Sequence, residues 1–457
     1  MNKNMIAESG NTFNMFFKER IQHQVCIYFL SFIFILQTDV WAQESVLTLN
    51  KAIELTLSNN FDVKITEIDK ERNKNNDQAG NASMLPRLDL NGSYTKSNLN
   101  TQQSYSSGQE VNRDNVSSEN LNANATLNWT IFDGMKMLST RQKLGELYFQ
   151  SEEKLKIQME NTLQELITEY FTIVQQKQLL KATRTEITYA EERIRIAERK
   201  LSNGSGSRLD YLQTKADLNA LRSAELNQES ALESAKIRLN LLTVKNQSME
   251  FDVEDSIIID YRPNLDDLKT SAFKTNHLLK YFEKNQRISE LSLSVIKAAR
   301  LPKISLNGTY QYSKVNNEVG FILLNQNTGF NYGITATLPL FNGFTLSSLV
   351  KNARLSVKES QLMLDQTRQE LTADLYNAFR DFNHNMTILQ LEEENIVYAQ
   401  QILQIAQEKY RVGSSNLLDV KNAQATFESS VGRLVNARFE AKISETVLRR
   451  LNGDLIH

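Results

Sequence analysis

The sequence predicts a mainly α-helical fold with a β-barrel portion, written twice along the chain. Three observations predict it: few chain-breaking residues, a repeated set of motifs, and four segments that alternate between apolar and polar residues. Only 4 prolines and 16 glycines occur in 457 residues, well below the roughly 12% of an average protein. Long stretches without either residue are typical of long helices, and they exclude sandwiches, propellers and doubly wound α/β domains.

Charge and composition exclude several classes of function. The 52 lysines and arginines nearly balance the 54 aspartates and glutamates, so no basic field exists to bind nucleic acid. The four histidines are scattered, with none at the spacing of a helical metal site. The single cysteine, Cys26, excludes an intramolecular disulfide and a thiolate metal cluster. Because we find no nucleophile elbow and no phosphate loop, we expect neither an enzyme nor a cofactor or metal.

The N-terminus has the layout of a secretory signal over residues 1–42. Positive residues precede the apolar run Val25–Leu36, and Ala42 is a small residue at the expected cleavage site. The run is too short to span a bilayer as a helix, and an N-terminal membrane anchor is the alternative. Translation begins at Met1 or at Met15. We expect an exported chain that is either soluble outside the cytoplasm or embedded in a membrane as a β-barrel.

The chain after the signal contains each motif twice, in the same order. The motifs are a Leu-Pro strand start, a Phe-Asx-Gly turn, and a Gly-Ser followed by Leu-Asp and Ala. The first set lies at Leu85–Tyr94, Ile131–Gly134 and Lys200–Ala216, and the second at Leu301–Tyr310, Leu340–Gly343 and Lys409–Ala425. We interpret this as a tandem duplication, with a first repeat at 43–246, a linker at 247–263 and a second repeat at 264–457.

Each repeat predicts a helix, two strands joined by a polar loop, a very long helix and a return helix. The opening helix of the first repeat is expected from Leu47 to Met84, before Pro86. The other elements are expected at about 87–96, 121–132, 134–201 and 208–244, and again at about 303–313, 330–341, 344–411 and 416–451. The linker contains a possible strand, Ser256–Tyr261.

The long helices carry narrow apolar stripes. At 1.5 Å per residue the longest would extend about 100 Å, which exceeds the diameter of an ordinary globular domain. Narrow stripes favour side-by-side, coiled-coil-like packing. Taken alone, the helices are also compatible with a plain antiparallel coiled-coil scaffold.

The strands change that interpretation. Leu121–Ile131 alternates strictly between apolar residues and Asn or Thr, and Phe330–Leu340 repeats the pattern. Each strand of about ten residues has the length of a tilted outer-membrane strand, and an uncharged polar face suits a wet lumen. A soluble antiparallel sheet would show the same alternation. If the sheet lies in a membrane, four strands cannot close a barrel, so several chains must pool them, and three would supply twelve.

These features together resemble the TolC-like outer-membrane efflux protein family over about residues 46–452. The opening helix Leu47–Asn60, the strand starts, the turns at Gly134 and Gly343, and the paired helix tips carry the resemblance. It implies a homotrimer whose twelve-stranded barrel in the outer membrane of a Gram-negative-type bacterium continues into a long α-helical barrel across the periplasm.

The resemblance also implies a function. Such channels are passive exit ducts of tripartite efflux pumps or type I secretion systems, and they dock a periplasmic adaptor (membrane fusion) protein and an inner-membrane transporter. The alternative from the residues is a periplasmic coiled-coil scaffold or adaptor protein. The sequence does not select the substrate or the pump class.

The family closes its tunnel at the periplasmic helix tips, which therefore hold the expected site residues. The expected gate and lumen residues are Asp210, Asp419, Tyr410, Asn422 and Ser415. The expected tip-turn and adaptor-docking residues are Gly204, Ser205, Leu209, Gly413, Ser414 and Leu418. Ser415 and Asn422 replace an arginine and an acidic residue that are common in the family, so the details of the closing network are expected to differ.

Physical chemistry allows two interpretations of the role of the tip aspartates. Three copies of Asp210 or Asp419 around a narrow axis would repel one another, which would raise their pKa values and favour cation capture. The alternative is that each aspartate only caps the helix that starts beside it.

Overall fold

The structure is a computed structural model that describes residues 46–244 and 251–456. The predicted signal and Cys26 lie outside the described residues. The chain divides into two compact units. The smaller unit contains the parallel pair of β1 (Val46–Leu47) and β4 (Asp252–Val253), and the larger unit holds the remaining elements. Among the described helices, none is long and apolar enough to be a membrane span.

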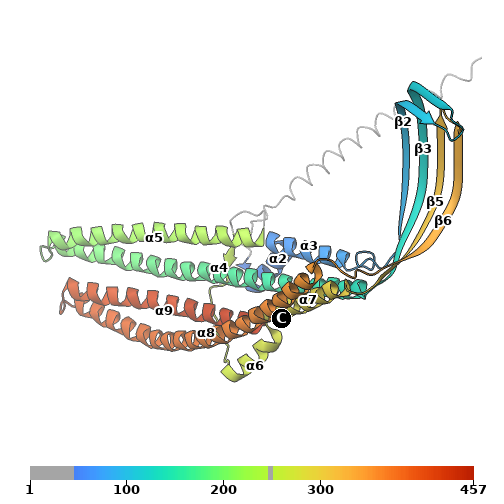
Figure 1. Ribbon diagram of the computed structural model, residues 1–457. Helices are drawn as coiled ribbons and strands as arrows, with labels where there is room; N and C mark the ends of the chain where they lie inside the picture. The colour runs from blue at the N-terminus through green and yellow to red at the C-terminus, as the bar shows by residue number, and fades with distance from the viewer. Residues whose placement is uncertain (1–45, 245–250, 457) are drawn as a thin grey trace, which may run out of the picture. The chain divides into compact units, whose positions relative to one another are not determined.

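Two long helical hairpins dominate the larger unit (Figure 1). The first consists of α4 (Lys136–Ser202) and α5 (Arg208–Thr243), and the second of α8 (Thr345–Arg411) and α9 (Leu417–Asn452). The corresponding helices have equal lengths in the two halves, 67 and 36 residues. Helices of 67 residues extend about 100 Å, as the scarcity of proline and glycine predicts.

Shorter helices precede each sheet hairpin: α2 (Leu49–Asn59), α3 (Phe61–Asn76), α6 (Leu265–Thr275) and α7 (His277–Ala298). The expectation of one helix from Leu47 to Met84 is wrong. The side chain of Asn60 accepts hydrogen bonds from the backbone N–H groups of residues 62 and 63 and so caps a new helix there. Asn276 has the same role between α6 and α7. Residues 77–84 form turns instead of helix.

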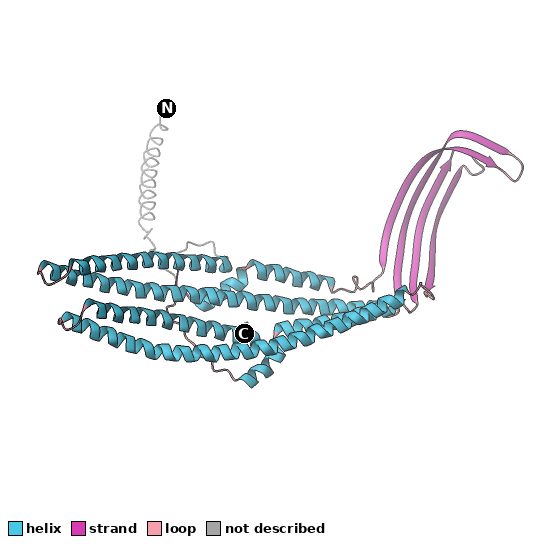
Figure 2. Ribbon diagram, turned by 60° about the vertical axis from the view of Figure 1, so that its left-hand side comes forward, coloured by secondary structure: helices cyan, strands magenta, loops and turns pink. Residues whose placement is uncertain are grey.

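Four antiparallel strands form the larger sheet (Figure 2). They are β2 (Arg87–Ser104), β3 (Glu110–Asp133), β5 (Lys303–Asn317) and β6 (Leu324–Thr337), in the order β2-β3-β5-β6. All four are longer than the expected ten or so residues, because their polar ends continue the ladder into the expected loops. β6 begins before its expected start at 330 and also stops before its expected end at 341. Pro339 follows it and cannot donate a ladder hydrogen bond. The possible strand Ser256–Tyr261 is not formed.

The core of the larger unit is long and thin. Buried side chains of α4, among them Leu163, Leu166 and Tyr170, lie in a stripe along this helix. In the second half, Leu375 of α8 and Leu448 of α9 belong to one apolar cluster. The narrow stripes therefore pack helix against helix, as coiled-coil-like spacing predicts.

Candidate functional site

The larger sheet has one apolar and one polar face. Directly opposed residues share a face, so the register aligns apolar residues across all four strands. One such row consists of Leu90, Ala125, Tyr310 and Phe330. The apolar side chains are open to the surroundings: Leu90 is 83% exposed and Tyr332 is 81% exposed. This sheet therefore presents a wide apolar surface that nothing in the described chain covers.

The apolar face is a band of limited height. Along β3 it extends from Leu121 to Ile131, about 33 Å of strand at roughly 3.3 Å per residue. At the roughly 40° tilt of outer-membrane strands this length spans about 25 Å along the membrane normal, the height of their apolar band. Beyond Tyr94 on β2 the band ends in the Lys96–Glu119 ion pair, with an N···O distance of 2.9 Å. Aromatic side chains and then charges thus mark the edge of the band, as at a membrane interface.

The opposite face carries Asn, Thr and Ser side chains that bond to one another across the strands. Asn91 donates to Asn124 at 3.1 Å, and Asn307 donates to the hydroxyl of Thr335 at 2.9 Å. These groups are uncharged and hydrogen-bonding, which suits contact with water.

The two predicted strand-to-helix turns are present. Gly134 and Gly343 have left-handed φ angles of 72° and 62° and stand just before α4 and α8. The carboxylate of Asp133 accepts a hydrogen bond from the N–H of Met137 at 3.1 Å, which caps the first turn of α4. The turn from sheet to helix is therefore sharp and locally specified.

The helix tips form equivalent turns in the two hairpins. The backbone N–H of Ser205 donates to the carbonyl oxygen of Lys200, and the backbone N–H of Ser414 donates to that of Lys409, both at 2.9 Å. Gly204 and Gly413 take left-handed φ angles of 71° and 80°. The leucines that follow, Leu209 and Leu418, are 70% and 63% exposed. Each tip thus presents an apolar side chain that the hairpin itself does not cover.

The two tip aspartates differ in their local roles. Asp419 forms a reciprocal capping box with Asn416: its backbone N–H donates to the Asn416 side chain at 2.9 Å, and its carboxylate accepts the Asn416 N–H at 3.4 Å. Asp210 lies in the first turn of α5, where the cap is Ser207. Capping therefore accounts for Asp419, whereas Asp210 contributes charge at the positive end of its helix.

The remaining expected gate residues do not form one network within the described chain. The ammonium group of Lys200 on α4 lies 3.8 Å from the ring centroid of Tyr410 on α8, a cation–π contact between the two helices. The hydroxyl of Ser415 donates to the neighbouring carbonyl of Asn416 at 3.3 Å. Asn422 is exposed on α9 and lines a cavity together with Arg193 and Glu428.

A polar cluster that the sequence analysis missed lies between the hairpins, back from the tips. It contains Glu186 and Arg193 of α4, Asp217 of α5, and Lys421 and Glu428 of α9. Burial, together with the neighbouring charge of Glu428, raises the pKa of Glu186 to about 8. Glu186, Arg193 and Glu428 lie outside the repeated motifs, so no motif marks them in the sequence.

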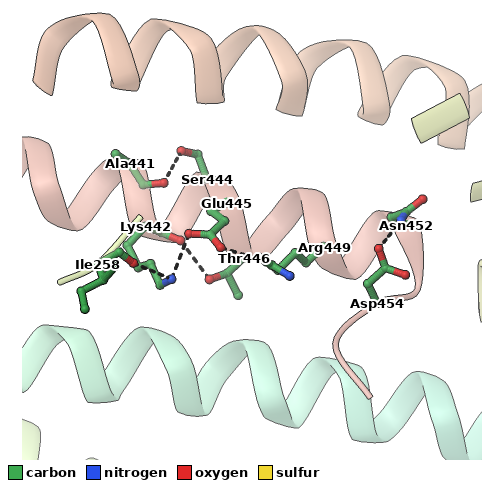
Figure 3. Close-up of polar contacts among 9 residues, drawn as sticks. All are labelled: Ile258, Ala441, Lys442, Ser444, Glu445, Thr446, Arg449, Asn452 and Asp454. Carbon is green, nitrogen blue, oxygen red and sulfur yellow. Dashed lines mark hydrogen bonds and ion pairs between the residues drawn. The ribbon is translucent and has the colours of Figure 1, made fainter. Parts of the chain in front are cut away.

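A second polar cluster anchors residues 255–261, which we call the strap (Figure 3). Glu445 of α9 is 2% exposed and accepts from Lys442 at 2.9 Å and from Arg449 at 2.8 Å. Lys442 also donates to the carbonyl of Ile258 at 3.0 Å. Because the Ile258 carbonyl accepts its hydrogen bond from a lysine side chain, this part of the strap is held by a side chain and not by a partner strand.

The strap also reaches the first hairpin. The amide of Gln178 on α4 donates to the carbonyl of Asp255 at 2.6 Å, and Lys177 pairs with the carboxylate of Asp255. On the other side, the ring of Tyr261 packs against Phe382 of α8, with centroids 5.9 Å apart. The strap therefore ties α4 to α8 and α9.

The sequence profile of one family, described as Outer membrane efflux protein, matches residues 52–243 and 270–454, which is most of the chain. The chain belongs to the outer membrane efflux protein family. The relationship suggested by the repeated motifs is thus confirmed. Relatives of the chain are named as outer membrane, efflux and secretion proteins, not as enzymes.

Relatives and solved structures match over most of the length. The outer membrane protein TolC of Escherichia coli K12 is 23% identical over 401 residues, covering 81% of this chain and 75% of TolC. The alkaline protease secretion protein AprF of Pseudomonas aeruginosa is 20% identical over 438 residues, covering 93% and 88%. The Campylobacter jejuni CmeC outer membrane channel has the same fold, with a TM-score of 0.76 and 18% identity over 91% of this chain and 90% of that one.

Family membership gives the class of function. The chain is an outer-membrane channel that serves as an exit duct in efflux or type I secretion. The apolar band, the polar face and the long hairpins are the parts of this structure that such a duct requires.

Proposed function

We propose that three copies of the chain form the channel, with a twelve-stranded barrel in the outer membrane and a long α-helical barrel in the periplasm. The observation that carries this is a sheet with an exposed apolar band whose edge strands, β2 and β6, have no partner on their outer sides in the described chain. Open edges would leave backbone N–H and C=O groups unsatisfied in lipid. Pairing β2 of one copy with β6 of the next removes both edges, and three copies of four strands give twelve.

The helix tips are the proposed gate. Asp210 and Asp419 would place six carboxylates around a three-fold axis, where like charges favour a bound cation. Tyr410, Ser415 and Asn422 would supply the uncharged part of the constriction. The capping role of Asp419 is compatible with this, because a capping carboxylate still carries its charge.

The tips are also the proposed docking surface for the periplasmic adaptor of a tripartite system. Leu209 and Leu418 are exposed apolar side chains at equivalent positions, and the turns at Gly204–Ser205 and Gly413–Ser414 present them. The polar face of the sheet carries mostly Asn, Thr and Ser, which suits many solutes and selects none of them. The inner-membrane transporter therefore selects the substrate, and it also supplies the energy.

We also propose that residues 43–246 and 264–457 are tandem repeats joined by the linker 247–263. The equal helix lengths in the two halves support this.

The trimer is tested by isolating the full-length protein from outer-membrane fractions. We expect a species of three chains in detergent that converts to a single chain on heating, and an ion-conducting channel in planar bilayers. Recovery as a soluble periplasmic monomer without conductance would instead support the scaffold alternative.

The gate is tested by replacing both tip aspartates. The double variant Asp210→Ala, Asp419→Ala should weaken block by a divalent cation added to the periplasmic side. Glu233→Gln, which removes an exposed carboxylate from α5 far from the tip, is the matched control and should block like the unaltered channel. Unchanged block in the double variant would show that the aspartates only cap helices.

A further inference from the structure

The loop between β5 and β6, residues 318–323, presents an apolar surface at one end of the larger sheet. β5 follows α7 and β6 leads to α8, so their connecting loop lies at the end of the sheet away from these helices. Phe321 is 92% exposed, and Ile322 and Leu323 are each more than half exposed. Apolar side chains gathered in one exposed patch are typical of an interaction surface.

This loop folds over the polar face of the sheet. A cavity of about 590 Å³ lies between Val319–Ile322 and the strands. Except for Ser104, the last residue of β2, the strand residues that line it belong to the polar face: Leu99, Thr101, Gln103, Val116, Ser118 and Asn317. The alternation of side chains along each strand and the direct pairing across strands place them there. The loop therefore lies on the face that the proposed barrel turns toward its lumen.

Hydrogen bonds fix the base of the loop to β3. The carboxylate of Glu318 accepts from the N–H of Ser117 at 3.0 Å, and the N–H of Glu318 donates to the carbonyl of Ser117 at 3.1 Å. The side-chain amide of Asn317 donates to the carbonyl of Ile322 at 3.3 Å. The chain itself thus sets the direction in which the loop leaves the sheet, while the ring of Phe321 stays exposed.

The outer end of the polar face differs from the rest of it. Toward the helices this face carries hydrogen-bonded Asn and Thr side chains, whereas at the outer end Leu99 is 60% exposed beside the apolar loop. Apolar side chains gain free energy when they contact one another and exclude water. A contact that buries Phe321 must come from outside the described part of the chain, because the described residues leave it exposed.

The dimensions of the proposed barrel let the loops of three copies meet. Twelve strands about 4.8 Å apart and tilted by about 40° have a circumference of about 75 Å and a radius of about 12 Å. A six-residue loop, with three residues out and three back, extends about 10 Å at roughly 3.3 Å per residue. The ring of Phe321 at the turn spans the remaining distance to the axis.

We propose that the β5–β6 loops of three copies meet at the barrel axis and form an apolar constriction, with the Phe321 rings at its centre, that closes the outer mouth of the channel. The partner of this surface is a second copy of the chain. An apolar constriction excludes water and hydrated ions until it widens, so the outer mouth has a barrier separate from the helix tips. This inference rests on the proposed function, because it needs the three-chain barrel.

The first test is cysteine cross-linking of the full-length protein in outer-membrane fractions. Phe321→Cys should be joined by a short bismaleimide into two-chain and three-chain species on denaturing gels. Gln326→Cys lies on β6 but on the opposite face of the sheet, so as the matched control it should remain a single chain. Both variants carry Cys26→Ser, so that the introduced thiol is the only one.

The second test measures access to the lumen from outside the cell. Asn331 lies on the polar face of β6, nearer to the helices than the loop, and Asn331→Cys places a thiol there. A bulky, membrane-impermeant maleimide added to intact cells should label this thiol slowly, and faster when Phe321→Ser is added. Leu324→Ser removes a similarly apolar side chain from the opposite face and should leave the labelling rate unchanged.

The native assembly of each variant in detergent, measured without the cross-linker, separates the two proposals. If the three-chain species forms but Phe321→Cys gives no cross-links, the constriction is overturned. Equal labelling of Asn331→Cys with and without Phe321→Ser also overturns it. A protein that forms no three-chain species contradicts the proposed trimer, and the constriction with it. Because Phe321 is 92% exposed, its replacement removes no packing within the chain.

Discussion

Gly134 and Gly343 occupy equivalent turns, yet a side chain would meet different surroundings at the two positions. Both have a left-handed backbone. A Cβ at Gly134 would lie 2.5 Å from the carbonyl oxygen of Ala298 and 2.6 Å from Cβ of Leu301. At Gly343 no atom of the described chain lies within 4 Å of that point. The substitutions Gly134→Ala and Gly343→Ala therefore separate backbone strain from steric overlap.

The two costs can be estimated from the geometry. A left-handed conformation costs an alanine about 1–2 kcal/mol at either position. At Gly134 the new methyl also overlaps the end of α7, where a carbonyl oxygen cannot rotate away, and overpacking of this kind costs about 1–3 kcal/mol more. We expect losses in the free energy of unfolding of about 1–2 kcal/mol for Gly343→Ala and about 2–5 kcal/mol for Gly134→Ala.

The assay is urea unfolding of each detergent-solubilised variant, followed by the far-ultraviolet circular dichroism of the helices. The comparison is between matched positions in the same chain, so the detergent and the proposed assembly affect both. Equal losses for the two variants, or a larger loss for Gly343→Ala, would refute the steric argument and leave backbone strain as the whole effect.

Three further predictions use the same unfolding assay. Asp419→Ala removes the reciprocal capping bond and should cost about 0.5–1 kcal/mol, whereas Asp210→Ala should cost less because another residue caps α5; equal losses would contradict this assignment. Burial raises the pKa of Glu160 from 4.5 to about 7, so stability should fall by up to about 3 kcal/mol as pH rises from 5 through 7, and Glu160→Gln should flatten that profile; a profile of unchanged slope would show that another group titrates. Glu445→Ala leaves two cations without their buried partner and should cost about 3 kcal/mol; a loss below 1 kcal/mol would mean that water replaces the carboxylate.

The helix tips and the polar cluster show which functional residues a repeated motif can predict and which it cannot. Asp419 and Gly413 belong to a repeated pattern, and repetition alone marked both tips. Glu186 and Glu428 lie outside every repeated motif, and each looks like an ordinary surface glutamate on a long helix. They become a pair only because α4 and α9 pack side by side, so no local signal could have joined positions so far apart in the chain.

By itself the sequence determined the lengths of the main helices, the alternation of the strands and the places where the chain turns. These features depend on local properties: the absence of proline and glycine, the period of the apolar residues and the backbone freedom of a few glycines. The tertiary structure decided where the opening helix breaks, how far the strands extend, and which charges meet between the hairpins. Those outcomes depend on capping, ladder pairing and burial, which arise only when distant segments pack against each other.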